Sequence, residues 1–343
     1  MNLPLSPKLG ITLAGVLALT VASARADSFG SGPNAFTIDF ADIGNAGNAD
    51  DVGAGGGRYF SPLGAVPYSY RMGVTEVAQD WITRATAGGL ANVTAGAWEG
   101  NRPAASMTWY EAAAFVNWLN ETSGYHKAYD LSPAGTAFSL WTAAEAWDND
   151  PGAGVDLNLF RHGEAHYFLP SEDEWYKSAY HKNDGVTANY WDYPTGSNFR
   201  PSLALNGGTT PGSAVYRDMI AVPSGPAEVN LAGGLSAYWT MGQGGNVLEW
   251  LENGIFQPPV GSTSRQFRGG AWEDDEHFLR SSGLGFDASR VPSNFIGLRV
   301  ASGVRPVENV PEAGSTAVML LLGVSLVFLI KRRRAAFADS EIR

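Results

Sequence analysis

The sequence has 343 residues, of which 44% are hydrophobic and 12% aromatic, which is enough apolar material for a sizeable core and excludes a chain that is disordered throughout. Its formal net charge is −11, and residues 27–330 alone hold 16 basic and 32 acidic residues, so nucleic acid is not an expected partner. The chain contains no cysteine, which excludes disulfides, thiolate metal sites, iron–sulfur clusters and cysteine nucleophiles.

The first 26 residues have the pattern of a secretory signal peptide. Lys8 precedes an apolar run over residues 10–22, and the small residues Ala24 and Ala26 follow on either side of Arg25. A charged region, an apolar region and a small-x-small cleavage site occur in this order in such peptides. We therefore expect cleavage after Ala26 and export of the rest of the chain, with a buried N-terminal helix as the alternative.

Two capping boxes predict helices. Thr108 and Glu111 form the first, and the helix after it is expected to end near Glu121, because apolar residues recur at helical spacing at Ala112, Phe115, Val116 and Leu119. Ser171 and Glu174 form the second box, which begins a helix that is expected to end near Tyr180.

Short strands are expected at residues 68–72, 167–169, 247–251, 265–268 and 296–301. The 42 glycines and 19 prolines exceed the average share and favour a fold with many turns. Few helices, short strands and long irregular stretches predict one loop-rich α+β domain over residues 27–306, not a βαβ arrangement.

The C-terminal segment, residues 307–343, reads as a sorting signal. An apolar stretch at about residues 314–330 is just long enough to span a bilayer, and the basic residues 331–334 follow it directly. With Pro311 and Glu312 ahead of the stretch, the segment resembles the PEP-CTERM sorting signal, in which the tail is read by an exosortase. Ala313 replaces the second proline of that signal. A plain C-terminal membrane anchor is the alternative.

Seven blocks in the body carry a second resemblance. They are residues 107–113 (MTWYEAA), 117–120 (NWLN), 167–175 (YFLPSEDEW), 245–250 (GNVLEW), 267–272 (FRGGAW), 279–282 (LRSS) and 296–301 (IGLRVA). In this order they resemble the formylglycine-generating enzyme family, also called sulfatase-modifying factor domains. The resemblance implies a C-type-lectin-like α+β fold. In plain physical terms Trp109, Trp118, Trp175, Trp250 and Trp272 are core or loop-pinning aromatics.

The family's oxidation of a cysteine to formylglycine uses copper held by two enzyme cysteines. The resemblance places those positions at Glu276 and Ser281, and the second arginine expected nearby at Leu284. Serine is a poor Cu(I) ligand because its alkoxide is hard and inaccessible near pH 7. No copper is therefore expected, and we expect no catalytic residue of the family's kind.

Acidic and aromatic residues surround the same positions. The groove candidates are Trp272, Glu273, Asp274, Asp275, His277 and Arg280. A run of charges is most simply a solvated face; the alternative is a divalent cation or ligand contact at the mouth of the groove.

His162 and His166 have the spacing of a helical zinc pair. Gly163 and the strand expected at residues 167–169 argue against a helix, so a solvated loop is expected there.

The resemblance also implies structural calcium, which would bind to the carbonyl groups of Gly245 and Val247 and the carboxylate of Glu249. The family's ligand three residues before this glycine is replaced by Gly242, so one side-chain ligand is lost.

Together these features predict an exported, non-catalytic binding module. We expect it at the cell surface, the outer membrane or in the extracellular matrix, anchored transiently in the inner membrane through its tail. Its partners would be an exosortase-type processing enzyme and a peptide or glycan ligand. The alternatives are a cysteine-independent, metal-dependent oxidoreductase of the same superfamily, with its metal near residues 273–277, and a structural matrix component.

Overall fold

The computed structural model describes residues 25–53, 62–94, 96–148, 157–252, 264–283, 285–288 and 292–304. The expected signal sequence before Arg25 and the whole sorting segment, including Pro311 and Glu312, lie outside the described residues. Across the described ranges no helix combines the length and apolar character needed to cross a bilayer. Ala26 belongs to the first strand, where it is paired with Asp39.

The larger sheet joins the two ends of the described chain. Its order is β1-β2-β3-β15-β8, with every neighbouring pair antiparallel. The bounds are β1 Arg25–Phe29, β2 Phe36–Ile43, β3 Tyr70–Gly73, β8 Tyr167–Phe168 and β15 Ala301–Gly303. Because the last strand lies between β3 and β8, the end of the body completes a sheet that its first residues begin.

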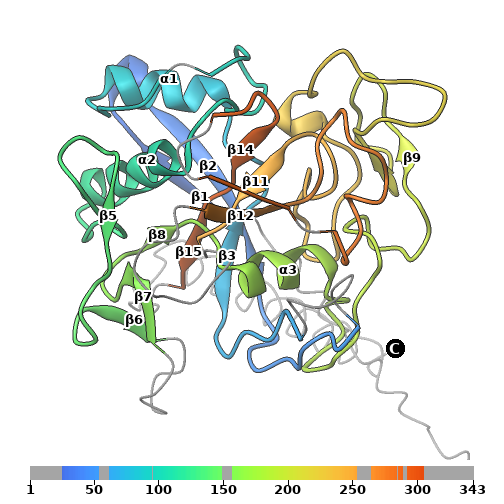
Figure 1. Ribbon diagram of the computed structural model, residues 1–343, viewed down its shortest axis with the longest axis horizontal. Helices are drawn as coiled ribbons and strands as arrows, with labels where there is room; N and C mark the ends of the chain where they lie inside the picture. The colour runs from blue at the N-terminus through green and yellow to red at the C-terminus, as the bar shows by residue number, and fades with distance from the viewer. Residues whose placement is uncertain are drawn as a thin grey trace, which may run out of the picture. The chain divides into compact units, whose positions relative to one another are not determined.

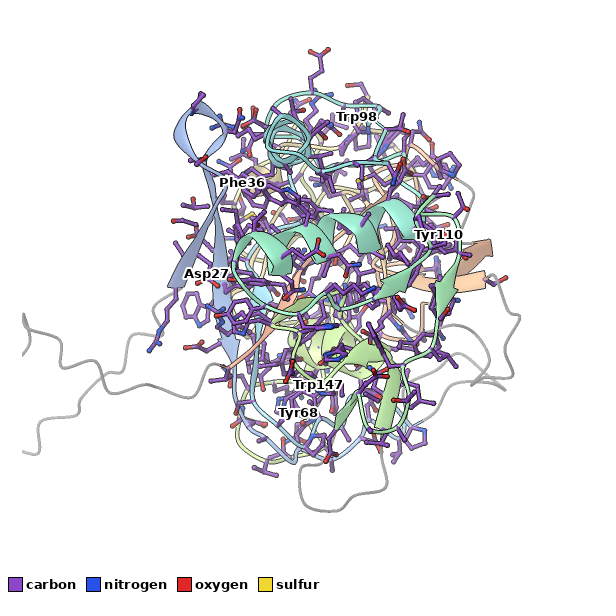
Figure 2. The ribbon with its side chains drawn as sticks, turned by 90° about the vertical axis from the view of Figure 1, so that its left-hand side faces the viewer. Asp27, Phe36, Tyr68, Trp98, Tyr110 and Trp147 are labelled. Carbon is purple, nitrogen blue, oxygen red and sulfur yellow. The ribbon has the colours of Figure 1, made fainter. Side chains whose placement is uncertain are left out.

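Helices cover this sheet. Phe36 of β2 stacks on Trp81 of α1 (Gln79–Ala87) and on Phe115 and Trp118 of α2 (Trp109–Thr122), with ring centroids 6.0–6.5 Å apart. Figure 1 shows α1 and α2 beside β1 and β2, and the long loops around β9 on the other side of the molecule. In Figure 2, α2 crosses the face that it covers and Phe36 lies beside it.

Both predicted capping boxes are confirmed. The Thr108 N–H donates to Glu111 at 2.8 Å, and the Glu111 N–H donates to the Thr108 hydroxyl at 3.2 Å. The same reciprocal bonds join Ser171 and Glu174 at the start of α3 (Glu172–Tyr180). Each box satisfies N–H groups that have no partner within the helix, which explains why both helices begin where the sequence predicts.

The second sheet has the order β13-β12-β11-β14, and only β11 and β14 are parallel among its pairs. Its bounds are β11 Leu248–Trp250, β12 Ser264–Arg268, β13 Gly285–Ala288 and β14 Ile296–Leu298. The single strand expected at 296–301 is therefore wrong. After β14 the chain crosses at Arg299 and Val300 into β15 of the larger sheet.

Short elements complete the described body. Three two-stranded pairs are formed by β4 (Asp130–Leu131) with β5 (Phe138–Ser139), β6 (Ala146–Asp148) with β7 (Leu157–His162), and β9 (Ser202–Leu203) with β10 (Ser213–Ala214). Single 3-10 turns lie at Gly32–Asn34 and Val229–Leu231. The loop-rich α+β prediction is confirmed.

Three tryptophans fix the core by burial and by one hydrogen bond each. Trp109, Trp175 and Trp250 are fully buried. Their indole N–H groups donate to the Leu251 carbonyl at 2.9 Å, to Glu249 Oε2 at 2.6 Å and to the Met107 carbonyl at 2.9 Å, respectively. Each therefore buries its large apolar surface without leaving its polar atom unpaired. The interpretation of these residues as core aromatics is confirmed, and Trp118 is buried as well.

A buried arginine joins three segments beneath the larger sheet. Arg161 of β7 contacts both carboxylate oxygens of Glu174 at 2.8–2.9 Å and both of Glu252 at 3.0 Å, and all three side chains are fully buried. Burial favours the neutral form of both acids, but the guanidinium holds the pKa of Glu174 below its usual value, whereas burial leaves that of Glu252 raised. The cluster thus ties β7 to α3 and to the end of β11.

Candidate functional site

The candidate groove loop, residues 271–281, begins at a glycine turn after β12. Gly269 and Gly270 have φ angles of 106° and 72°. A Cβ atom at position 270 would lie 2.8 Å from the Leu279 side chain. Glycine is therefore required at position 270, both for the left-handed backbone and for the close return of the loop. The FRGGAW block thus folds residues 278–279 back onto the turn.

The acidic run lies along this loop. Asp274 Oδ2 accepts the Ala271 N–H at 2.9 Å, which fixes the first turn of the loop. Burial, together with the charges of Glu273 and Asp275, raises the pKa of Asp274. The run is therefore a half-buried, electronegative ridge rather than a fully solvated face.

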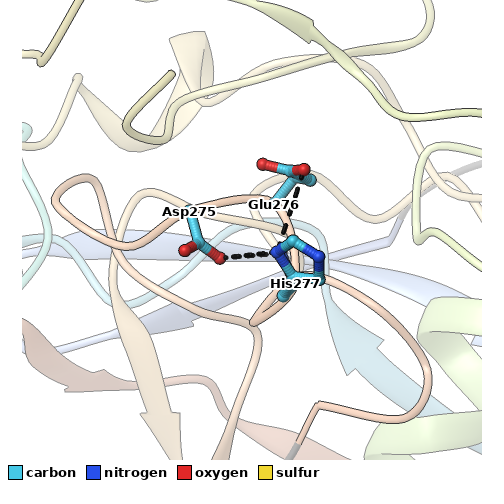
Figure 3. Close-up of side chains that lie close together, drawn as sticks. All are labelled: Asp275, Glu276 and His277. Atoms are coloured by element: carbon cyan, nitrogen blue, oxygen red, sulfur yellow. Dashed lines mark hydrogen bonds and ion pairs between the residues drawn. The ribbon is translucent and has the colours of Figure 1, made fainter. Parts of the chain in front are cut away.

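Asp275, Glu276 and His277 bring one ligand atom each to within 4.8 Å of one another. Figure 3 shows that one imidazole nitrogen, Nδ1, faces both carboxylates, 3.1 Å from Asp275 and 3.8 Å from Glu276. Carboxylate and imidazole ligands suit divalent cations rather than Cu(I). No other metal-ligand group of this kind occurs in the parts of the chain that the structure describes.

The rest of the loop contacts a segment that the sequence analysis did not identify. The Ser281 N–H donates to the Asp192 carbonyl at 2.9 Å, and Arg280 Nε donates to the Tyr193 hydroxyl at 2.9 Å. Arg280 is thereby turned toward Tyr193. No local sequence pattern distinguishes residues 192 and 193 as neighbours of the groove.

A second tryptophan joins Trp272. The rings of Trp98 and Trp272 lie edge to face with centroids 6.2 Å apart, and the Arg102 guanidinium lies 5.4 Å from the Trp98 ring. Trp98 donates to the Asn294 carbonyl at 3.1 Å, whereas the buried Nε1 of Trp272 has no hydrogen-bond partner in the described part of the chain. Figure 2 labels Trp98, which follows α1. The two indole rings form an aromatic pair, which we call the tryptophan surface, and the buried Nε1 of Trp272 belongs to it.

Asn246 holds this surface to the core. It is fully buried with a φ of 62°; its carbonyl accepts the Trp272 N–H at 2.9 Å and its side-chain oxygen accepts the Ala227 N–H at 2.7 Å. Its N–H donates to Val215 at 2.7 Å, and its side-chain amide donates to Glu76 at 3.0 Å. One residue of the GNVLEW block is therefore hydrogen-bonded to four other segments, among them the candidate groove loop.

An exposed apolar turn adjoins the acidic run. The Arg217 N–H donates to the Asp274 carbonyl at 2.8 Å. Directly after it, the turn closed by Asp218 N–H and the Ala221 carbonyl (2.9 Å) presents Met219 and Ile220, which are 96% and 93% exposed. Exposed apolar groups of this size next to charged residues are typical of interaction sites.

Of the three predicted calcium ligands, the Glu249 carboxylate is already contacted by other donors. The two oxygens of Glu249 accept from Arg299 Nε at 3.2 and 3.0 Å, from Arg299 Nη2 at 2.7 Å and from the Trp175 indole at 2.6 Å. A carboxylate has about four lone-pair positions, so these contacts use its acceptor capacity. A Cβ atom at Gly242 would lie 2.7 Å from the Glu76 carboxylate, so no side-chain ligand fits there either. The Arg299 cation is thus the partner of the Glu249 carboxylate, which disfavours calcium at this carboxylate.

We therefore expect EDTA to leave the melting temperature of the protein unchanged. A metal that binds only the folded state raises the melting temperature, and its removal lowers it. Thermal unfolding with EDTA and with added calcium measures this. A decrease in EDTA that calcium reverses and that Glu249→Gln abolishes would contradict the assignment.

The histidine pair is not a solvated loop, so that prediction is wrong. His162 and His166 are buried. His162 ends strand β7 and stacks on His126 with centroids 3.6 Å apart, while His166 stacks on Tyr125 at 4.6 Å. Burial and the neighbouring His126 lower the pKa of His162. Aromatic stacking, which local sequence does not reveal, explains the burial of both rings.

The comparisons with known proteins agree with this geometry. The profile of the family described as "Sulfatase-modifying factor enzyme 1-like domain" matches residues 35–304. The fold is similar to that of variable protein 1 of Treponema denticola, with a TM-score of 0.56 and 21% identity, over 82% of this chain and 100% of that one. It is also similar to the structure of CarF, with a TM-score of 0.55 and 17% identity, over 78% and 98% of the two chains. A sequence search found no match among curated proteins.

Proposed function

Because the chain belongs to the family of sulfatase-modifying factor enzyme 1-like domains, we propose that it is a binding module that keeps the family's scaffold without its copper chemistry. The proposal includes the family's C-type-lectin-like organisation, export after cleavage at Ala26, and a sorting tail that is read by an exosortase at Pro311 and Glu312. The module would then act at the cell surface, the outer membrane or in the extracellular matrix.

The observation that carries the proposal is the absence of cysteine from all 343 residues. At the family's thiolate positions stand Glu276 and Ser281. The Ser281 N–H donates to Asp192 at 2.9 Å, and its carbonyl accepts from Arg268 Nη1 at 3.2 Å. These backbone bonds fix the loop without a thiol. Since Cu(I) requires soft ligands, carboxylate and hydroxyl oxygens at these positions do not replace the lost site.

The acidic run and the adjoining apolar turn favour a basic, partly apolar peptide segment as ligand. The half-buried run from Glu273 to Glu276 supplies negative charge, and the Arg217–Asp274 backbone bond holds Met219 and Ile220 beside it. A cationic side chain gains Coulomb energy at the run, while an apolar neighbour is removed from water at the turn.

Binding of a 14-residue lysine–leucine peptide to the full-length chain tests this, with the corresponding glutamate–leucine peptide as control. We expect saturable binding of the lysine peptide alone, weakened by salt and by about tenfold in the double variant Asp275→Asn, Glu276→Gln. The double variant Met219→Ser, Ile220→Ser should also weaken it, because apolar contact is lost.

Glu145→Gln is the matched control, because Glu145 is an exposed acid outside the groove loop. Fluorescence anisotropy at two salt concentrations measures the affinities. Equal binding of both peptides, or an equal loss in the Glu145→Gln variant, would refute the proposed surface.

One observation favours a second function, a cysteine-independent metal enzyme. The ligand atoms of Asp275, Glu276 and His277 converge within 4.8 Å. Metal analysis of the purified full-length chain distinguishes the two functions, because copper or iron at unit stoichiometry, lost on His277→Ala, would support the oxidoreductase. A purely structural matrix role would instead leave both peptide and metal unbound.

A further inference from the structure

A tryptophan stands in a left-handed backbone conformation at an exposed turn. Trp239 has a φ of 68° and is 60% exposed. Bulky L-residues rarely adopt this conformation. Such geometry persists only where the surroundings impose it, and it concentrates at ligand-binding positions. A strained and exposed tryptophan does not stabilise the fold by burial, so a role in binding is indicated.

Buried hydroxyl groups fix the turn from below. The Ser236 N–H donates to the Thr240 carbonyl at 2.8 Å, and the Trp239 N–H donates to the Ser236 carbonyl at 3.0 Å. The hydroxyls of Ser236 and Thr240 lie 2.7 Å apart, and that of Ser236 also donates to the Ser178 carbonyl of α3 at 3.0 Å. The turn is thus preorganised, so a ligand that stacks on the indole binds with little loss of backbone conformational entropy.

Two asparagines adjoin the turn, and both also have left-handed backbones. Asn183 has a φ of 54° and donates to the Ala237 carbonyl at 3.1 Å. Asn45 has a φ of 55° and donates to Asn183 at 2.8 Å and to the Tyr238 hydroxyl at 3.0 Å. Three of the six positive-φ residues other than glycine in the described chain are therefore joined through this one turn, residues 236–240.

We propose that Trp239, Asn45 and Asn183 form a binding site for a neutral saccharide. The apolar face of a pyranose ring stacks on an exposed indole, and its hydroxyl groups need neighbours that both donate and accept hydrogen bonds. Each carboxamide supplies two donors and a carbonyl acceptor, and the bonds given above leave part of this capacity unused. The acidic body, with 16 bases against 32 acids over residues 27–330, disfavours anionic glycans.

This site is separate from the proposed peptide surface, because none of its residues belongs to the loop at 271–281 or to the Met219–Ile220 turn. The inference goes beyond the proposed function, and either can fail alone.

Calorimetric titration of the full-length chain with neutral hexaoses of glucose, mannose, galactose and N-acetylglucosamine tests the site. We expect saturable binding of at least one hexaose, an affinity loss of tenfold or more in Trp239→Ala, and a loss of less than threefold in Trp239→Tyr, which keeps an aromatic face. Asn183→Ala should weaken binding as well, because a saccharide hydroxyl then loses its hydrogen bond to the Asn183 carboxamide.

Phe199→Ala is the control, since Phe199 is an 82% exposed aromatic residue outside the site, and its affinity should match that of the native chain. Melting temperatures of all variants separate loss of binding from loss of folding. Absence of binding to every hexaose, or undiminished binding in a folded Trp239→Ala variant, would overturn the proposal. If Trp239→Ala does not fold, equal affinities of Asn183→Ala and the native chain would overturn it.

Discussion

Replacing Arg161 by methionine is expected to destabilise the fold by about 3–5 kcal/mol at pH 7. The substitution removes the cation that contacts Glu174 and Glu252, both fully buried, and among the described residues leaves the two carboxylates without a counter-ion. Chemical denaturation of the full-length protein measures the free energy of unfolding. The penalty should shrink as the pH falls toward 4, because without the guanidinium burial favours the protonated form of both acids, and protonation costs less free energy at low pH.

The matched control is Arg84→Met. Arg84 forms an ion pair with Asp80 at 2.6 Å on the surface of α1, where both side chains are about 40% exposed. Exposed pairs contribute at most about 1 kcal/mol, so this variant should lose little. Equal losses in the two variants would show that the buried cluster is not the specific tie between β7, α3 and the end of β11.

Replacing Glu76 by glutamine is expected to stabilise the protein increasingly as the pH rises. Burial raises the pKa of Glu76 to about 8, although Arg299 partly opposes the shift. Between pH 4.5 and 8 the unfolded chain therefore releases a proton that the folded chain retains, so folding stability falls as the pH rises through this range. Glutamine does not ionise. The variant should match the native protein near pH 4 and exceed it by up to about 4 kcal/mol at pH 8.

Denaturation curves at pH 4, 6 and 8 measure this difference. Glu121→Gln is the control, because Glu121 is an exposed acid near the end of α2, where surface substitutions change stability by about 0.5 kcal/mol or less. A stability difference for Glu76→Gln that is the same at pH 4 and pH 8 would show that Glu76 does not retain its proton in the folded state.

The sequence predicts the helices whose first residues carry a capping motif. The Thr108 and Ser171 boxes give α2 and α3 to within a residue, because capping is a local interaction. Helix α1 was not predicted. Its N-cap is Ala78, whose side chain cannot accept a hydrogen bond, so the start carries no local signal.

Strand β2 was also missed, although its pattern is readable. Phe36, Ile38 and Phe40 are buried and Thr37 and Asp39 are exposed, which is the alternation of a strand with one face in the core. After Phe40 the pattern shifts by one residue, because Ala41 is buried as well. The prediction of a single strand at 296–301 is wrong for a different reason. Its two halves pair with strands from distant parts of the chain, and this crossing is decided by tertiary contacts.

The candidate site was predicted only where it is continuous in sequence. The acidic run and Trp272 lie in one loop that the FRGGAW and LRSS blocks bracket. Trp98, the hydrogen bonds of Asn246 to four other segments, and the Met219–Ile220 turn were not identified, because they depend on contacts between residues far apart in the chain. The same holds for the ion pair of Glu249 with Arg299, 50 residues away, which no local pattern indicates.

Export, tail cleavage and localisation stay predictions, and the intact mass of the cell-associated protein checks two of them together. Removal of the residues before Asp27 and of those after the Pro311–Glu312 pair gives a defined mass. A mass that includes either terminus contradicts the corresponding step.

We propose that this scaffold has no copper oxidation chemistry, because Glu276 and Ser281 stand where the resemblance places the family's copper-binding cysteines. The direct test incubates the full-length chain in air with Cu(I) and a cysteine-containing sulfatase peptide, and follows the peptide by mass spectrometry and hydrazine labelling. We predict that the peptide acquires no aldehyde. Conversion of its cysteine to formylglycine at a rate proportional to protein concentration would contradict the account.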